Sequence, residues 1–140
     1  MITICHTVGA CAFRSDSAIL NQVSGQIIVA AFAVHKELGP GLLESVYETC
    51  LCHELKLRNI PFRSQVSLPV RYKDLQLENG LRLDLVVADL VIVELKSVQR
   101  IEAVFEAQLL SYLKLSGFRV GLLINFNAPI LKEGIFRFVV

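Results

Sequence analysis

Three charged residues interrupt the most hydrophobic stretch of this 140-residue chain. The stretch Arg82–Lys96 reads RLDLVVADLVIVELK and predicts a β-hairpin, with Asp84 on its first strand and Glu94 and Lys96 on its second. Ionised side chains are costly to bury unless they are paired or bind a metal. Two carboxylates on one face would suit a hard cation such as Mg²⁺ or Mn²⁺, which prefers oxygen ligands. The hairpin therefore predicts a divalent-metal site.

The charged residues of the hairpin allow two interpretations, a catalytic metal site and a structural charge cluster. A divalent metal can lower the pKa of a bound water and neutralise charge on a scissile phosphate. Lys96, two residues after the second carboxylate, could place its ammonium group against the attacking water or the phosphate oxygens. The spacing Glu-x-Lys is nevertheless common by chance. In the alternative, Lys96 and Arg82 simply balance Asp84 and Glu94 in a structural charge cluster, and the hairpin alone leaves both interpretations open.

The register of the hairpin decides whether its carboxylates can meet. Side chains alternate between the two faces of a strand, so that Arg82 shares a face with Asp84, and Glu94 with Lys96. A two-residue turn would point Asp84 away from Glu94, whereas a three-residue turn at 88–90 would place them directly opposite each other. The metal-site hypothesis therefore requires the three-residue turn, a bulge, or local splaying of the strands.

Apolar periodicity and turn residues predict the elements that surround the hairpin. Spacings of three and four predict helices over 24–38, with Ser24 as N-cap, over 42–58 and over 100–117. Apolar runs predict strands over 65–72, 75–87 (broken near 79–80), 90–98, 119–125 and 134–140, and Pro69 predicts an edge strand or a bulge in the first of them. This order predicts an α/β (α+β) fold with a mixed central β-sheet flanked by helices.

The predicted helices carry further polar residues that could serve the hairpin. Glu44 lies three residues from both Gly41 and Tyr47, so the three share one stripe of the second helix. Its carboxylate is either a first-turn residue favoured by the helix dipole or a group aimed at the same cleft as the hairpin. Gln108 and Tyr112 lie four apart on the third helix and share one face.

Composition bounds the class of protein and its compartment. The chain is 54% hydrophobic and 19% charged with a net charge of +1, so nucleic-acid binding would need a local basic patch. No apolar run approaches the roughly 18 residues of a membrane span, and the four cysteines have neither zinc nor disulfide spacing. We expect a cytoplasmic protein that contacts no membrane and forms a homodimer through apolar surface. Residues 1–22 are expected to be a loosely ordered extension and 23–140 one domain.

The hairpin and its surroundings resemble a known family. Asp84 followed by Glu94-Leu95-Lys96 resembles the motif of the PD-(D/E)xK nuclease superfamily. More specifically, Gly41–Tyr47 (GLLESVY) resembles the signature of the GxxExxY protein family, a bacterial group within that superfamily. The same pattern is matched by residues 38–41, 91–96, 108–114 and 121–127, and the resemblance covers about 24–140. It implies a restriction-endonuclease-like αβββαβ core.

The resemblance implies catalytic roles for the polar residues. Asp84 and Glu94 would be ligands of Mg²⁺ or Mn²⁺, with the Leu95 carbonyl as a third, and Lys96 would be the catalytic lysine. Glu44 would reach the metal directly or through water.

The resemblance also implies substrate contacts. Gln108 and Tyr112 match a Gln-x-x-x-Tyr element that lines the active site or contacts nucleic acid in exonuclease-like members, and we assign Tyr47 and Arg82 to substrate binding as well. One departure is Phe105, which occupies the place where the family pattern leads us to expect a histidine. The resulting hypothesis is a Mg²⁺-dependent nuclease that acts on DNA. The alternative is a catalytically inactive nuclease-fold module that binds nucleic acid or a protein partner.

Overall fold

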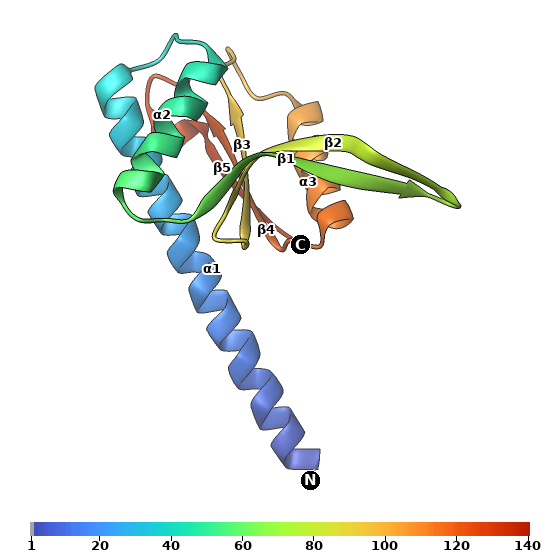
Figure 1. The fold of residues 1–140 in the computed structure, drawn as a ribbon. Helices are drawn as coiled ribbons and strands as arrows, with labels where there is room; N and C mark the ends of the chain where they lie inside the picture. The colour runs from blue at the N-terminus through green and yellow to red at the C-terminus, as the bar shows by residue number, and fades with distance from the viewer. Residues whose placement is uncertain (1) are drawn as a thin grey trace.

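A mixed β-sheet lies between two layers of helices. The computed structural model describes the backbone of residues 2–140 and the side chains of residues 16–140 (Figure 1). The elements, in chain order, are α1 (Ile2–Leu38), α2 (Glu44–Leu57), β1 (Phe62–Tyr72), β2 (Leu75–Val87), β3 (Val91–Lys96), α3 (Ala103–Ser116), β4 (Val120–Asn125), the short 3₁₀ helix η1 (Leu131–Gly134) and β5 (Ile135–Val139). The predicted fold class and order of helices and strands are confirmed.

The five strands follow chain order across the sheet, β1-β2-β3-β4-β5. All neighbouring pairs are antiparallel except β3 and β4, which are parallel and joined through α3. A parallel pair needs a crossover connection, and α3 supplies it. Both β3 and β4 are buried almost throughout, as central strands covered on two faces should be.

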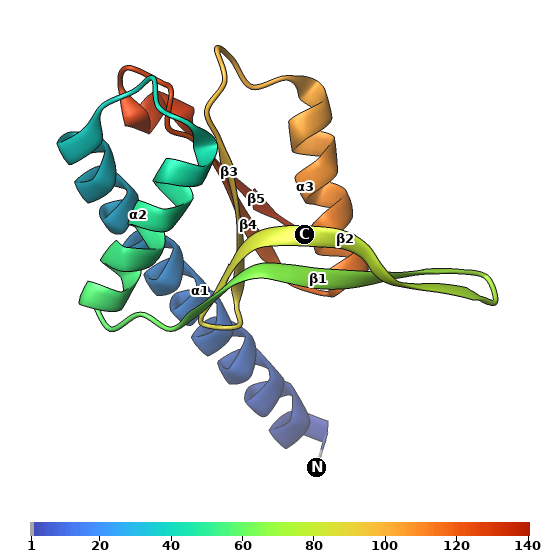
Figure 2. The same ribbon diagram turned by 45° about the horizontal axis from the view of Figure 1, so that its top comes forward.

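Each face of the sheet has its own apolar core. One core joins α1 and α2 to the sheet through Ile27, Leu51, Val93 and Leu122. The other joins α3 to the opposite face through residues that include Ile92, Leu109, Tyr112, Leu113 and Leu123. The views in Figures 1 and 2 show α1 and α2 on one side of the sheet and α3 on the other. Residues on the α3 face of β3 are therefore the ones that α3 can contact.

Helix α1 begins far earlier than the sequence predicts. Ser24 is not an N-cap, because it lies inside the helix and its hydroxyl donates to the Leu20 carbonyl oxygen at 2.8 Å. Leu20 itself is buried in the core, so the domain boundary expected at residue 22 falls within a packed part of the helix. By length and composition alone, Asp16–Leu38 could cross a membrane. In this fold its apolar side, including Ile27 and Ala31, packs against the sheet and α2.

The β1–β2 hairpin extends beyond the sheet and projects past α3 (Figure 2). The prediction from Pro69 is confirmed, since β1 is an edge strand and its register shifts between Leu68 and Val70. The break predicted near residue 80 appears as an irregularity within β2: the strand runs through it, but residues 78–80 are skipped where Leu81 pairs with Leu68 and Leu77 with Val70. Gly80 allows β1 to approach closely here, because a Cβ atom there would lie 2.7 Å from Val70 Cγ2.

Tyr47 fixes the connection between α1 and α2. Its side chain is fully buried and its ring stacks on Phe126, with centroids 4.6 Å apart. Its hydroxyl donates to the Gly39 carbonyl oxygen at 2.6 Å and accepts from the Leu42 amide at 3.1 Å. The tyrosine thereby holds the turn that leads into Glu44.

Replacement of Tyr47 by phenylalanine tests this role. Tyr47→Phe keeps the ring but removes the partner of the Leu42 amide and the Gly39 carbonyl. The expected loss is about 1–2 kcal/mol of unfolding free energy, or roughly 3–6 °C in Tm. Differential scanning calorimetry should show no such loss for Tyr72→Phe, since Tyr72 is exposed on the hairpin. Equal melting of the two variants would contradict the assignment.

Candidate metal centre

The turn between β2 and β3 has the register that a metal site requires. Val87 pairs with Val91, which leaves the three-residue turn Ala88–Leu90. Ala88 and Asp89 both have positive φ, 54° and 52°, and the Leu90 amide donates to the Val87 carbonyl oxygen at 3.0 Å. In this register Asp84 lies opposite Glu94, so the three-residue alternative is confirmed.

The strands also part at the two acidic residues. Regular pairing ends at Leu85 and Val93, one step before Asp84 and Glu94. Beyond it, the Asp84 amide donates to Glu94 Oε1 at 3.2 Å, and the Leu95 amide donates to Asp84 Oδ2 at 2.9 Å. Each carboxylate thus takes the place of a strand carbonyl as acceptor, which satisfies the backbone where the ladder opens. Both the predicted turn and the splaying are present.

Asp84 lies on the α3 face by alternation with Val86, and β2 rotates immediately before it. Leu83 packs in the core beneath α3, whereas Leu85 packs in the core beneath α1 and α2. Regular alternation would put these two residues on the same face, so β2 rotates at Asp84. Its partner strand is irregular at the same level, where Gln65 has a φ of 51° and is skipped in the pairing.

Glu94 is a buried carboxyl group beside a second one. It is 5% exposed and alternates with Val93 and Leu95 of the opposite core, so it lies on the α3 face. Its pKa is raised to about 8, first by burial and then by the charge of Asp84 and a hydrogen bond between the two carboxyl groups. The Asp84 amide and the charge of Lys96 act in the opposite direction and lower this pKa. Glu94 therefore keeps its proton at neutral pH.

Glu44 approaches this pair from another element. It begins α2, and its carboxylate accepts a hydrogen bond from the Ser97 backbone. The Ser97 hydroxyl in turn donates to the Leu42 carbonyl oxygen, so the α1–α2 turn and the segment after β3 are joined. Burial raises the pKa of Glu44, while Lys96 lowers it and Asp84 raises it. Among the described side chains, no three His, Cys, Asp or Glu residues are gathered closely enough to form a metal cluster.

Lys96 ends β3 on the α3 face, two residues beyond Glu94. Its Nζ atom lies 4.6 Å from the centre of the Phe105 ring, a cation–π distance. Its positive charge lowers the pKa of both Glu44 and Glu94. The ammonium group is therefore close enough to act on the carboxyl groups and on a ligand between them.

Gln108 and Tyr112 form the α3 side of the site. Gln108 Nε2 donates to the Tyr112 hydroxyl at 2.6 Å. Burial raises the pKa of Tyr112, the hydrogen bond with Gln108 lowers it, and the charges of Glu94 and Asp84 raise it again. The structure thus brings this predicted pair to the acidic residues.

Two predicted substrate contacts lie elsewhere. Tyr47 is fully buried, with its hydroxyl engaged by the α1–α2 turn, and so acts on the site through the position of Glu44. Arg82 is exposed and lies between Leu81 and Leu83, which both face α3. It therefore points to the opposite face from Asp84, contrary to simple alternation, because β2 rotates between the two.

Asn125 was not singled out from the sequence. It pairs in register with Lys96 at the end of β4 and is 4% exposed. Its Oδ1 atom accepts from the Val98 amide and its Nδ2 atom donates to the Val98 carbonyl oxygen, both at 3.0 Å. Asn125 thereby fixes the chain just after Lys96. The available signal was a polar residue that ends an otherwise apolar strand.

The donor set fits Mg²⁺ or Mn²⁺. Asp84, Glu94 and the Leu95 carbonyl offer only oxygen ligands, which these hard cations prefer. The raised pKa of Glu94 keeps a proton beside the Asp84 carboxylate, and a divalent ion can replace that proton. Glu44 can join through water, since Mg²⁺ usually keeps several waters.

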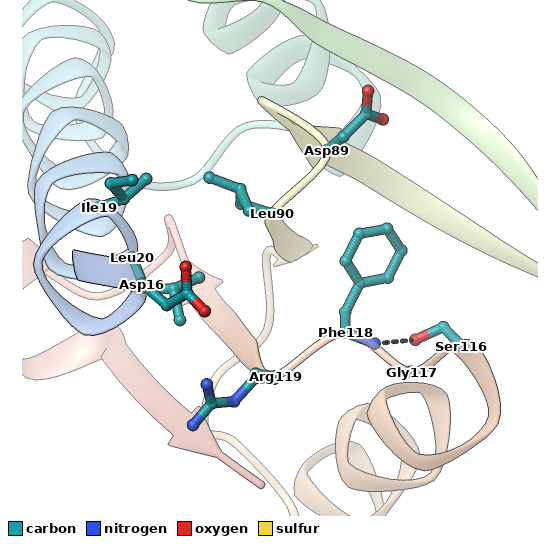
Figure 3. Close-up of a pocket in the computed structure, with 9 residues that line it drawn as sticks. All are labelled: Asp16, Ile19, Leu20, Asp89, Leu90, Ser116, Gly117, Phe118 and Arg119. Atoms are coloured by element: carbon teal, nitrogen blue, oxygen red, sulfur yellow. Dashed lines mark hydrogen bonds between the residues drawn. The ribbon is translucent and has the colours of Figure 1, made fainter. Parts of the chain in front are cut away.

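A separate pocket of about 450 Å³ lies at the other end of β3 (Figure 3). It is lined by the β2–β3 turn, the α3–β4 connection and α1, through residues such as Ile19, Leu90 and Phe118. Its acidic lining residues are Asp16 and Asp89, and neither Asp84, Glu94 nor Glu44 lines it. This pocket is thus distinct from the candidate metal centre.

Comparison with known families adds one result. The model of the PD-(D/E)XK nuclease superfamily matches residues 21–138, most of the chain. No curated protein and no solved structure matches. The matched range contains every residue of the candidate centre.

The buried carboxyl pair predicts how stability depends on pH. A raised pKa means that folded Glu94 keeps its proton where the unfolded chain would lose it, so stability falls as pH rises from about 4.5 to about 8. Glu94→Gln removes this charge. In the presence of a chelator, its Tm should match that of the wild type near pH 5 and exceed it by roughly 5–10 °C at pH 9. A constant difference in Tm across this range would contradict the buried pair.

Proposed function

Because the chain belongs to the PD-(D/E)XK nuclease superfamily, we propose that it is a Mg²⁺-dependent nuclease that hydrolyses phosphodiester bonds in DNA. The observation that carries the proposal is the meeting of Asp84 and Glu94 where β2 and β3 part, with Lys96 on the same face. This arrangement is costly to the fold without a cation, which supports a role in binding one.

Each residue of the centre would have a separate task. Asp84, Glu94 and the Leu95 carbonyl would hold the Mg²⁺ ion, and Glu44 would orient one of its waters. A bound Mg²⁺ supplies Lewis acidity, which activates water and offsets phosphate charge. Lys96 would hold its ammonium group against the phosphate oxygens as negative charge develops there. Gln108 and Tyr112 would orient the substrate strand from α3, which is supported by the electrostatic influence of both acidic residues on Tyr112.

A finer family assignment belongs to the same proposal. We place the chain in the GxxExxY group, a bacterial family, on the motif Gly41–Tyr47. The roles of its key residues support this placement: Tyr47 secures the turn, and Glu44 then reaches the segment after β3. In this proposal the residues of the motif act together to position Glu44. Arg82, exposed on the hairpin, would contact the DNA backbone at a distance from the reacting phosphate.

The proposal also includes a cytoplasmic compartment and assembly into a homodimer. Cys50 and Cys52 are free thiols, which supports the reducing cytoplasm. Val29, Phe32 and Leu57 are exposed apolar residues of α1 and α2, which supports a homodimer.

Cleavage of DNA tests the activity. Purified protein with Mg²⁺ or Mn²⁺ should nick or degrade members of a panel of single-stranded, duplex and branched DNA, followed on denaturing gels. Lys96→Ala should reduce the rate by at least about a hundredfold, because the charge on the phosphate loses its partner. Lys114→Ala is a matched control, since this lysine is exposed on α3. Equal cleavage by wild type and Lys96→Ala would contradict the proposal and indicate a contaminant.

Metal binding can be tested without turnover. Mn²⁺ should raise the Tm of the wild type by several degrees, because it binds the folded state alone. Asp84→Asn should abolish this increase, whereas Asp74→Asn, at an exposed position near the hairpin tip, should preserve it. DNA binding with no metal-dependent change in Tm and no cleavage would favour the inactive nuclease-fold module instead.

A further inference from the structure

The catalytic lysine of the proposed nuclease has an unusual neighbour. Lys96 Nζ lies 4.6 Å from the centre of the Phe105 ring. No ion pair involving Lys96 is present among the described side chains, although the charge of Lys96 acts on both Glu44 and Glu94. The ammonium group therefore lies against an aromatic face rather than against one of the available carboxylates.

A neutral ring has an advantage over a carboxylate as a partner for this lysine. A carboxylate that paired with Lys96 would be lost to the metal and would neutralise the charge that the phosphate needs. The negative face of an aromatic ring attracts an ammonium group and leaves its full positive charge available. The ring can thus orient Lys96 at no cost to either function.

The local structure fixes the Phe105 ring. Phe105 lies in the first turn of α3, where its amide donates to the Glu102 carbonyl oxygen at 3.0 Å. Its side chain is half-buried and packs against the core beneath α3. Lys96 in turn is fixed at the end of β3, next to the segment that Asn125 holds. Both partners are therefore attached to well-packed elements.

We propose that Phe105 is a positioning residue, whose ring face holds the Lys96 ammonium group in place for the phosphate and away from the metal-binding carboxylates. The proposal rests on the proposed nuclease function for its catalytic consequence. The contact itself does not depend on that function.

Kinetics of four proteins test the catalytic consequence. Wild type, Phe105→Leu, Phe105→Tyr and Phe118→Leu are compared on one DNA substrate with Mg²⁺. Phe105→Leu should lower kcat by about fivefold to thirtyfold, the range that a cation–π contact can supply, with little change in KM. Phe105→Tyr keeps an aromatic face and should retain most of kcat. Phe118→Leu should keep wild-type kcat, because Phe118 is also half-buried in the α3 core but lies beyond the opposite end of β3.

Two results in this series would overturn the proposal. One is a kcat for Phe105→Leu equal to that of Phe118→Leu. The other is a kcat for Phe105→Tyr as low as that of Phe105→Leu. Fluorinated phenylalanines at position 105 sharpen the test, because successive fluorines weaken the negative ring face at nearly constant shape. The logarithm of kcat should fall steadily along this series, and an unchanged kcat would exclude a contribution of the cation–π contact to catalysis.

Nuclear magnetic resonance separates this proposal from the nuclease assignment. The Lys96 side-chain protons nearest the ammonium group should resonate upfield in the wild type, because they lie over the ring, and should move downfield in Phe105→Leu. If the wild type fails to cleave DNA but shows this shift, the nuclease proposal fails while the contact stands. If the shift is absent, the positioning role fails whatever the activity.

Discussion

Burial of Glu94 beside Asp84 is the constraint on which the rest of the site depends. A carboxyl group that is 5% exposed would normally be disfavoured in an apolar wall, and a second carboxyl group increases that cost. The fold tolerates the pair through two backbone amides, the proton that Glu94 keeps and the nearby charge of Lys96. Two carboxylates at this distance suit a divalent cation, which is why the proposed metal site centres on them.

The neighbouring elements are arranged around this pair. The three-residue turn at 88–90 places the two residues opposite each other, and the splayed ladder frees the amides that hold them. Asp84 lies on the α3 face by alternation with Val86, and the rotation of β2 before it turns Leu83 toward the core beneath α3 as well. Tyr47 and Asn125 then hold the two segments that carry Glu44 and follow Lys96. The contacts that stabilise these two segments are thus also the ones that position the side chains of the candidate site.

Much of the fold could be predicted because apolar periodicity reports burial directly. The continuous apolar runs of β3 and β4 identified the central strands, and Pro69 identified the edge strand. The start of α1 could not be found in this way. Serine is a favoured N-cap residue, but the Ser24 hydroxyl donates to the Leu20 carbonyl oxygen inside the helix. Gly80 marks an irregularity in the ladder, as a glycine within a strand pattern predicts, but its close approach to Val70 depends on tertiary packing.

The residues of the candidate site could be named from the sequence, but their geometry could not. The sequence defined what register Asp84 and Glu94 required, yet only the structure selected the three-residue turn. The rotation of β2 at Asp84 changes which face Arg82 occupies, and strand alternation contains no signal for it. Contacts between distant segments, such as Asn125 with Val98 and Lys96 with Phe105, likewise depend on tertiary packing.

Location of a bound cation tests the central claim most directly. Crystals soaked in Mn²⁺ can be measured for anomalous scattering, which identifies the ion without reference to activity. The account predicts one strong peak between Asp84 and Glu94, at roughly 2.0–2.2 Å from carboxylate oxygens of both and within reach of the Leu95 carbonyl. A map with no peak there, or with Mn²⁺ held only by other residues, would contradict the assignment of this carboxyl pair as a metal centre.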